Sequence, residues 1–144
     1  MTDFRPATLA DVAVLRHIET SCFSDPWTED MLESEIEMPH SRYVVMLQDG
    51  TVAGYYAYMH VLDEVHILNV AVLPEFQGRG LGRILMRHLL SNLPDGVVGV
   101  TLEVRVGNTR AIRLYESLGF VRQGLRKGYY AGEDAAIYWL TEGD

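Results

Sequence analysis

The chain contains a single cysteine, Cys22, among its 144 residues. One cysteine allows no disulfide bond within the chain, which favours a reducing compartment. The five histidines lack the regular spacing of a metal site, so we expect no bound metal. The first residues lack the apolar region of a signal peptide, and no stretch approaches the roughly 20 apolar residues of a membrane span. These absences predict a soluble, cytoplasmic protein.

Positive charge is also scarce, because 12 lysines and arginines stand against 20 aspartates and glutamates, a net charge of −8. Without a basic face, we expect no direct binding of nucleic acid. An acidic surface instead favours encounters with basic partners. The composition, 48% hydrophobic and 22% charged, is that of a globular protein with a real core. The length predicts a single domain over residues 1–144.

The hydrophobic pattern changes period along the chain. Apolar residues at helical spacing predict four helices: 8–22, one from about 28, 81–93 and 109–118. β-branched and aromatic runs predict strands at 43–47, 52–61, 65–72 and 97–104, from 120 onward, and at 135–140. This order predicts a mixed α/β sheet rather than a helical bundle or a sandwich.

The strongest local motif is the glycine loop Gln77-Gly-Arg-Gly-Leu-Gly82, which follows a predicted strand and opens a predicted helix. Glycines there let backbone N–H groups approach an anion at the positive end of a helix dipole, and diphosphate is the natural ligand. A P-loop is excluded because no Gly-Lys-Ser/Thr follows. A dinucleotide fingerprint is excluded because the third glycine falls one residue early and several elements precede the loop. A plain glycine-rich corner remains the alternative.

The flanking residues resemble a known family. The stretch from Asn69-Val-Ala-Val-Leu-Pro74 through the glycine loop resembles the acetyl-CoA-binding motif of the GNAT superfamily of N-acetyltransferases. The later blocks agree: Leu102-Glu-Val-Arg105, Asn108, and Ala111-Ile-x-Leu-Tyr-Glu-x-Leu-Gly-Phe120. Further matches resemble the bacterial branch that acetylates the N-terminal alanine of ribosomal proteins: Pro26-Trp27, Leu62-Asp-Glu64, Tyr129-Tyr130 and Glu133-Asp134-Ala135. Gly78 departs from that branch, which often has a basic residue there.

The resemblance runs from about Leu9 to Ile137 and implies both a fold and a site. The implied fold has mostly antiparallel N-terminal strands, flanking helices and a parallel strand pair splayed around acetyl-CoA. The implied catalytic residues are Glu103 as general base and Tyr115 as general acid towards the sulfur of coenzyme A. The residues implied to contact acetyl-CoA are Val70, Ala71, Val72, Gln77, Gly78, Arg79, Gly80, Leu81, Gly82, Arg83 and Asn108.

Each of these residues also has a purely structural interpretation. Glu103 suits the exposed end of a strand, and Tyr115 lies on the apolar side of its predicted helix. Asn108 suits a helix N-cap. Arg79 and Arg83 fit a solvated surface. Both interpretations stay open at this point.

The implied acceptor residues are acidic or aromatic, which suits a cationic peptide N-terminus. They are Trp27, Asp63, Glu64, Tyr129 and Tyr130. The expected activity is acetyl transfer to the N-terminal α-amine of a protein, namely the N-terminal alanine of a basic small-subunit ribosomal protein. Two alternatives remain: acetylation of a small-molecule amine or a protein lysine, and a non-catalytic acetyl-CoA-binding regulator. We expect a monomer or a weak dimer.

Overall fold

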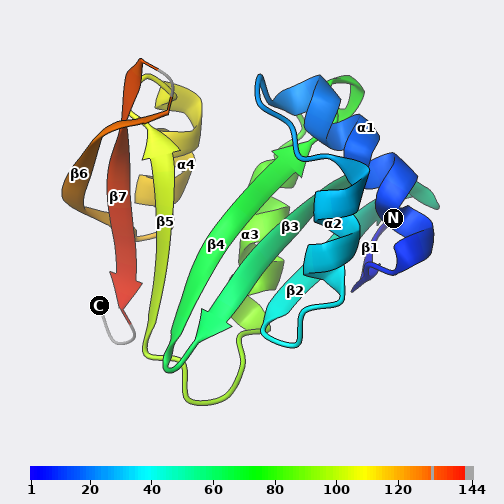
Figure 1. Ribbon diagram of the computed structural model, residues 1–144, viewed down its shortest axis with the longest axis horizontal. Coiled ribbons are helices and arrows are strands. Elements are labelled where there is room, and N and C mark those ends of the chain that lie inside the picture. The colour runs from blue at the N-terminus through cyan, green and yellow to red at the C-terminus, as the bar shows by residue number, and fades with distance from the viewer. Residues whose placement is uncertain (131, 142–144) are drawn as a thin grey trace.

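A computed structural model describes residues 1–130 and 132–141, and at Tyr130 the backbone alone. One seven-stranded sheet of order β1-β2-β3-β4-β5-β7-β6 runs through the molecule (Figure 1). Its strands are β1 (Thr2–Pro6), β2 (Ser41–Gln48), β3 (Thr51–Val61), β4 (Glu64–Val72), β5 (Gly99–Arg105), β6 (Val121–Tyr130) and β7 (Glu133–Thr141). Every strand pair that the structure describes is antiparallel except β4 with β5.

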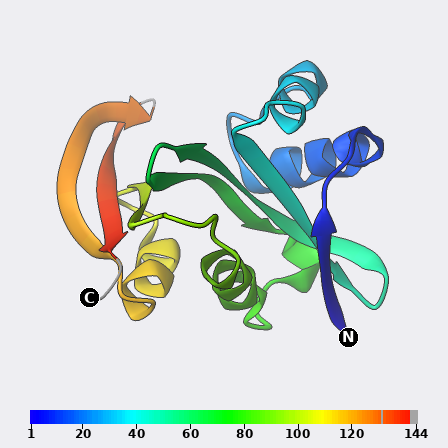
Figure 2. The ribbon, with the colours of Figure 1, turned by 90° about the horizontal axis from the view of Figure 1, so that it is seen from below.

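Helices cover both faces of this sheet. The described helices are α1 (Val12–Cys22), α2 (Glu29–Ile36), α3 (Leu81–Ser91) and α4 (Thr109–Ser117), with short 3-10 turns at Leu9–Asp11 and Pro74–Phe76. Figure 2 shows α1 and α2 on one face, with α3 and α4 on the other. Each face buries its own apolar cluster, one built around α3 and the other around α1. This architecture confirms the predicted mixed α/β fold with one parallel strand pair.

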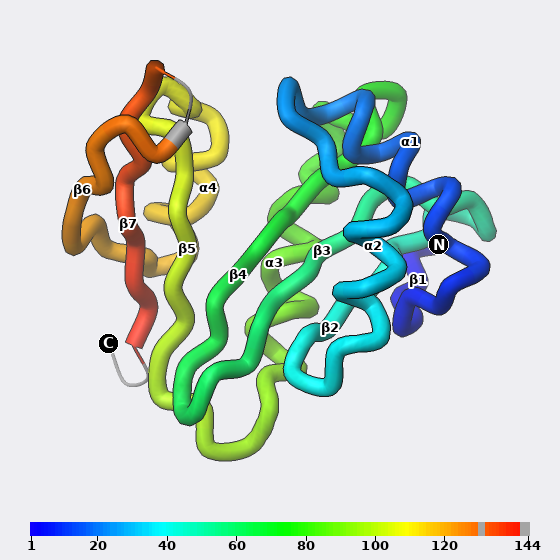
Figure 3. The backbone as a smooth tube through the Cα atoms, in the orientation of Figure 1, coloured from blue at the N-terminus to red at the C-terminus, as the bar shows by residue number. Residues whose placement is uncertain are grey.

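The parallel pair β4–β5 is joined over a short length. Residues 64–66 of β4 pair with residues 99–101 of β5, and beyond them the two strands diverge (Figures 1 and 3). On the other side of β4, the register with β3 shifts so that Leu68 is one extra residue between Ile67 and Asn69. Such a bulge bends a strand and increases its twist. The C-terminal half of β4 therefore leaves β5 and has no described strand on that edge.

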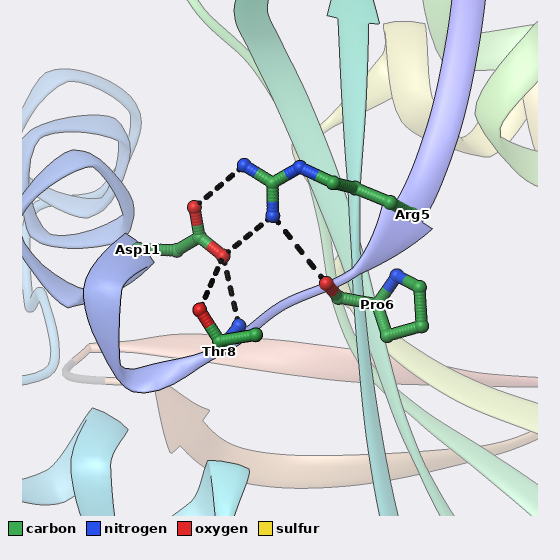
Figure 4. A network of polar contacts seen from close by, with 4 residues as sticks. All are labelled: Arg5, Pro6, Thr8 and Asp11. Atoms are coloured by element: carbon green, nitrogen blue, oxygen red, sulfur yellow. Dashed lines mark hydrogen bonds and ion pairs between the residues drawn. The ribbon is translucent and has the colours of Figure 1, made fainter.

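The start of α1 is tied to β1 by a buried carboxylate (Figure 4). Both oxygens of Asp11 accept hydrogen bonds from the Arg5 guanidinium at 2.8 Å, and the backbone N–H of Thr8 donates to the same carboxylate at 2.8 Å. The Arg5 guanidinium holds the pKa of the Asp11 carboxyl below its usual value. The predicted helix start at Thr8 is therefore confirmed. The strand β1, which carries Arg5, has no counterpart among the predicted elements.

Three further points concern the end of α4, membrane-spanning helices and the domain boundary. Gly119 has a φ of +99° just after α4, as expected for a glycine that ends a helix. Within the described residues, no helix has the length and apolarity needed to cross a bilayer. The single-domain boundary at 1–144 stays a prediction.

Candidate active site

A cleft of about 510 Å³ lies beside the C-terminal half of β4, where β5 has separated from it. Four segments line it: the end of α1, β4, the glycine loop with the first turn of α3, and one side of α4 with its N-cap. The lining residues are Cys22, Phe23, Val70, Ala71, Val72, Gln77, Gly78, Gly80, Leu81, Gly82, Arg83, Asn108, Arg110, Ala111, Leu114 and Tyr115. The structure thus brings together every predicted cofactor residue except Arg79.

The glycine loop leaves open space beside two of its glycines. Gly78 and Gly80 have φ values of +83° and +76°, and a Cβ built on either meets nothing within 4 Å. Gly80 is the N-cap of α3 and contributes no side chain to cap its first N–H groups. These amides, at the positive end of the helix dipole, form a site for an anion. Of the two interpretations of the loop, a diphosphate-binding site therefore fits this geometry better than a glycine-rich corner with no ligand.

The carbonyl oxygen of Val72 ties two neighbouring segments to the end of β4. The Gln77 side-chain amide donates to it at 2.9 Å and the Cys22 thiol at 3.3 Å. Burial raises the pKa of this thiol, and the charges of Glu19 and Glu75 raise it further. Cys22 therefore stays protonated at neutral pH and acts as a hydrogen-bond donor rather than as a nucleophile.

Asn108 and Tyr115 bring α4 to the cleft. The Asn108 side chain accepts a hydrogen bond from the backbone N–H of Ala111 at 3.2 Å, so it is an N-cap and lines the cleft at once. The Tyr115 ring lies 5.9 Å from the Phe120 ring and packs against the cluster around α3. Tyr115 therefore reaches the cleft from the face of the sheet that carries α3 and α4.

The two arginines of the glycine loop differ in position. Arg83 lines the cleft, and its guanidinium donates to the Ser117 hydroxyl at 2.7 Å. The guanidinium of Arg79 instead lies over the Phe76 ring, 5.4 Å from its centroid. Arg79 therefore fits the surface interpretation better than a place in the cleft.

Glu103 lies on the opposite face of the sheet from Tyr115. Its neighbours Leu102 and Val104 pack into the cluster under α3 and α4, so the intervening side chain projects towards the face covered by α1 and α2. The carboxylate is 27% exposed and lies 3.3 Å from the Arg126 guanidinium of β6. Tyr115 lines the cleft, whereas Glu103 does not.

The predicted acceptor residues fall into two groups. Trp27, between α1 and α2, packs against the cluster around α1, and the 48% exposed Tyr129 ring lies 4.8 Å from the Arg126 guanidinium. In Figure 1 the α1–α2 connection and the far end of β6 lie on either side of the diverging strands. Asp63 and Glu64 lie at the opposite end of β4. The side chain of Tyr130 lies outside the described residues.

Several residues of the site were not predicted. They are Cys22, Phe23, Arg110, Ala111 and Leu114 in the cleft, and Arg126 beside Glu103. The apolar stripe of α4 was a usable signal for Ala111 and Leu114, because it continues to Tyr115. Arg126 had no such signal, because its approach to Glu103 depends on the register of β6 and β7. Over residues 1–130 and 132–141, no three His, Cys, Asp or Glu side chains form a metal-binding group.

The comparison with known families agrees with this geometry. The profile of the acetyltransferase (GNAT) family matches residues 12–120. The chain belongs to the GNAT family. It is 39% identical over 137 residues to the ribosomal protein bS18 alanine N-acetyltransferase of Escherichia coli. The alignment covers 90% of each chain.

Two further relatives cover nearly the whole length. The N-alpha-acetyltransferase RimI of Mycobacterium tuberculosis is 38% identical over 145 residues, 95% of this chain and 90% of that protein. The crystal structure of the ribosomal-protein-S18-alanine N-acetyltransferase from Escherichia coli superposes with a TM-score of 0.91 at 36% identity. The superposition covers 98% of this chain and 94% of that one. GNAT enzymes use acetyl-CoA as co-substrate, and the cleft is suited to it.

Proposed function

We propose that this GNAT protein transfers the acetyl group of acetyl-CoA to the N-terminal α-amine of a protein, specifically the N-terminal alanine of a small-subunit ribosomal protein. One observation carries the proposal: a cleft beside an uncovered strand edge, with Glu103 and Tyr115 on opposite faces of the sheet. The two relatives from Escherichia coli and Mycobacterium tuberculosis, named for alanine and N-alpha acetylation, support the acceptor.

Acetyl-CoA binding uses the two open backbone surfaces of the cleft. The pantetheine arm adds to the edge of β4 at residues 70–72 through main-chain hydrogen bonds, as an added strand does. It uses main-chain groups other than the Val72 carbonyl, which already accepts from Gln77 and Cys22. The diphosphate lies against the N–H groups at the start of α3, where Gly78 and Gly80 leave room for it. Asn108 and Arg83 line the same cleft and supply further polar contacts.

The chemistry divides between the two faces of the sheet. Glu103 accepts a proton from the α-ammonium group, directly or through water, and the neutral amine attacks the thioester carbonyl carbon. Backbone N–H groups of residues 70–72 stabilise the oxyanion that forms. The carbon–sulfur bond then breaks, and the Tyr115 hydroxyl donates its proton to the departing thiolate. The attacking nitrogen loses its second proton to solvent, which gives the amide, and the tyrosinate takes up a proton from solvent. An α-amine has a pKa near 8 against about 10.4 for lysine, so it loses its proton more readily at neutral pH.

A basic acceptor suits the charge of the face that carries Glu103. The α2 segment and its flanks carry five exposed acidic side chains, Asp25, Glu29, Asp30, Glu33 and Glu37. No lysine or arginine stands between Arg16 and Arg42. Such a surface attracts a positively charged polypeptide and speeds its encounter with the site.

The cofactor assignment is tested with a pair of matched glycines. Gly80 and Gly96 have φ values of +76° and +81°, and a Cβ on either meets nothing within 4 Å. Gly80→Ala and Gly96→Ala should therefore cost similar stability, about 1 kcal/mol each, for a left-handed alanine. Only Gly80→Ala should weaken acetyl-CoA binding, by about tenfold or more, since its methyl group occupies the anion site. Titration calorimetry that finds equal affinities in the two variants contradicts the assignment.

The acceptor assignment is tested with peptides. A peptide that begins with Ala and carries nearby lysines and arginines should be acetylated once, on its terminal nitrogen. Its KM should rise with salt, because screening weakens attraction between exposed charges. Fragmentation mass spectrometry locates the acetyl group, with an N-terminally blocked peptide as control. Acetylation mainly on lysine, or faster turnover of a polyamine, would favour the lysine or small-molecule alternative. The absence of turnover with any amine would favour the non-catalytic regulator.

A further inference from the structure

Glu19 is a carboxylate in the apolar interior, only 1% exposed, at the last turn of α1. Its Oε1 accepts a hydrogen bond from the backbone N–H of Trp27 at 2.8 Å. Its Oε2 accepts from the Asn69 side-chain amide at 2.9 Å and from the Tyr55 hydroxyl. The Asn69 amide also donates to the Tyr55 hydroxyl oxygen at 3.0 Å. One side chain thus gathers three neutral donors from three segments.

Two of the three segments that Glu19 joins line the cleft: β4 and the connection between α1 and α2. Asn69 follows the bulged residue Leu68, at the point where β4 turns away from β5. Trp27 belongs to the connection between α1 and α2, of which Phe23 lines the cleft. Arg16, one turn before Glu19 on α1, donates to the carbonyl oxygen of Trp27. Side chains of α1 therefore hold both backbone polar atoms of Trp27.

We propose that Glu19 is a positioning residue for the acceptor, because it holds the α1–α2 connection in a single position relative to β4. This inference rests on the proposed function, which brings the acceptor between that connection and the diverging strands. A carboxylate has acceptor sites alone, so it satisfies all three donors together. Glutamine keeps the volume but replaces one oxygen by NH₂, which leaves a donor facing a donor.

Steady-state kinetics of Glu19→Gln test the proposal, with Asp11→Asn as the matched control. Asp11 is the other buried carboxylate of this region, at the opposite end of α1, and it too accepts a backbone N–H and further donors. Glu19→Gln should raise the KM of the acceptor peptide about tenfold and change kcat by less than about threefold. Its Kd for acetyl-CoA should stay within about twofold of wild type. Asp11→Asn should lower the unfolding temperature and leave the acceptor KM unchanged.

A second variant and a second readout keep the proposal falsifiable if Glu19→Gln folds poorly. Arg16→Met keeps the aliphatic stem, removes the donor to Trp27 and should raise the acceptor KM in the same direction. Amide hydrogen exchange at Trp27 should be slow in the wild type and at least about tenfold faster in either variant. An unchanged acceptor KM in a folded Glu19→Gln, or an equal rise in Asp11→Asn, overturns the proposal.

The two proposals fail in distinguishable ways. If the wild type acetylates no peptide, the proposed function fails, and the exchange rate of the Trp27 amide decides the role of Glu19. Faster exchange in Glu19→Gln than in Asp11→Asn then supports the inference that Glu19 holds the α1–α2 connection in place. Equal protection of the Trp27 amide in the wild type and both variants overturns that inference.

Discussion

Glu103→Gln is expected to lower kcat by about 10²–10⁴-fold, the usual cost of losing a positioned acid or base. Glutamine fills the same volume on β5 and still faces Arg126, so the sheet should keep its register. The Kd for acetyl-CoA should change little, because Glu103 lies outside the cleft that the cofactor residues line.

The matched control is Glu133→Gln. Glu133 lies on β7, its carboxylate is 33% exposed, and it pairs with Arg105 of β5 at 3.4 Å. The ion pair repeats the one between Glu103 and Arg126, which lie 3.3 Å apart. Glu133 in addition accepts a hydrogen bond from the backbone N–H of Gly107 at 2.8 Å, which the glutamine side-chain oxygen can still accept. Exposed ion pairs contribute little to stability, so neither change should unfold the protein. A wild-type kcat in Glu103→Gln, or an equal loss in Glu133→Gln, would return Glu103 to the role of an exposed strand-end carboxylate.

Tyr115→Phe should lower kcat by about 10²-fold, or roughly 3 kcal/mol in activation free energy. The ring and its contact with Phe120 are retained, and only the hydroxyl that protonates the departing thiolate is lost. Acetyl-CoA affinity should stay within about threefold of the wild type, because one hydroxyl contributes little to binding of so large a ligand. Stopped-flow or quenched-flow measurement of a single turnover separates the chemical step from product release.

Tyr138→Phe is the control for the loss of a tyrosine hydroxyl in the same layer. The Tyr138 hydroxyl donates to Glu116 at 3.1 Å and does not line the cleft. Its removal should cost about 1 kcal/mol of stability and leave kcat near the wild-type value. If Tyr115→Phe behaves like Tyr138→Phe in turnover, Tyr115 is a core tyrosine and the general acid lies elsewhere.

The elements predicted correctly are those whose signal is local. The helices around Leu85 and Ile112 follow from apolar spacing within a few turns, and the strand ending at Val72 follows from its β-branched run. The strand β1 was missed because its five residues carry little pattern of their own, and it exists through pairing with β2, about 40 residues further along the chain. Pairing between distant segments depends on the sheet as a whole.

The site divides along the same line. The glycine loop was predictable because its consecutive residues act together through their backbone. The predicted acceptor residues do not all lie together. Glu64 begins β4 and Val72 ends it at the cleft, so the two are roughly 25 Å apart for an extended strand. The sequence motif joined Asp63–Glu64 to the site, whereas the direction of the strand separates them from Tyr129.

The amino-acid sequence by itself determined the acidic charge, the order of the helices and of every strand except β1, the glycine loop, and the family resemblance through Glu103 and Tyr115. The tertiary structure decided how far β4 and β5 stay paired and on which face of the sheet each catalytic candidate lies. It also brought Arg126 to Glu103 and Glu19 to Trp27. The physical reason is distance along the chain. Periodicity and backbone conformation are set by neighbouring residues, whereas register, the bulge at Leu68 and buried polar contacts arise only when distant segments are packed together.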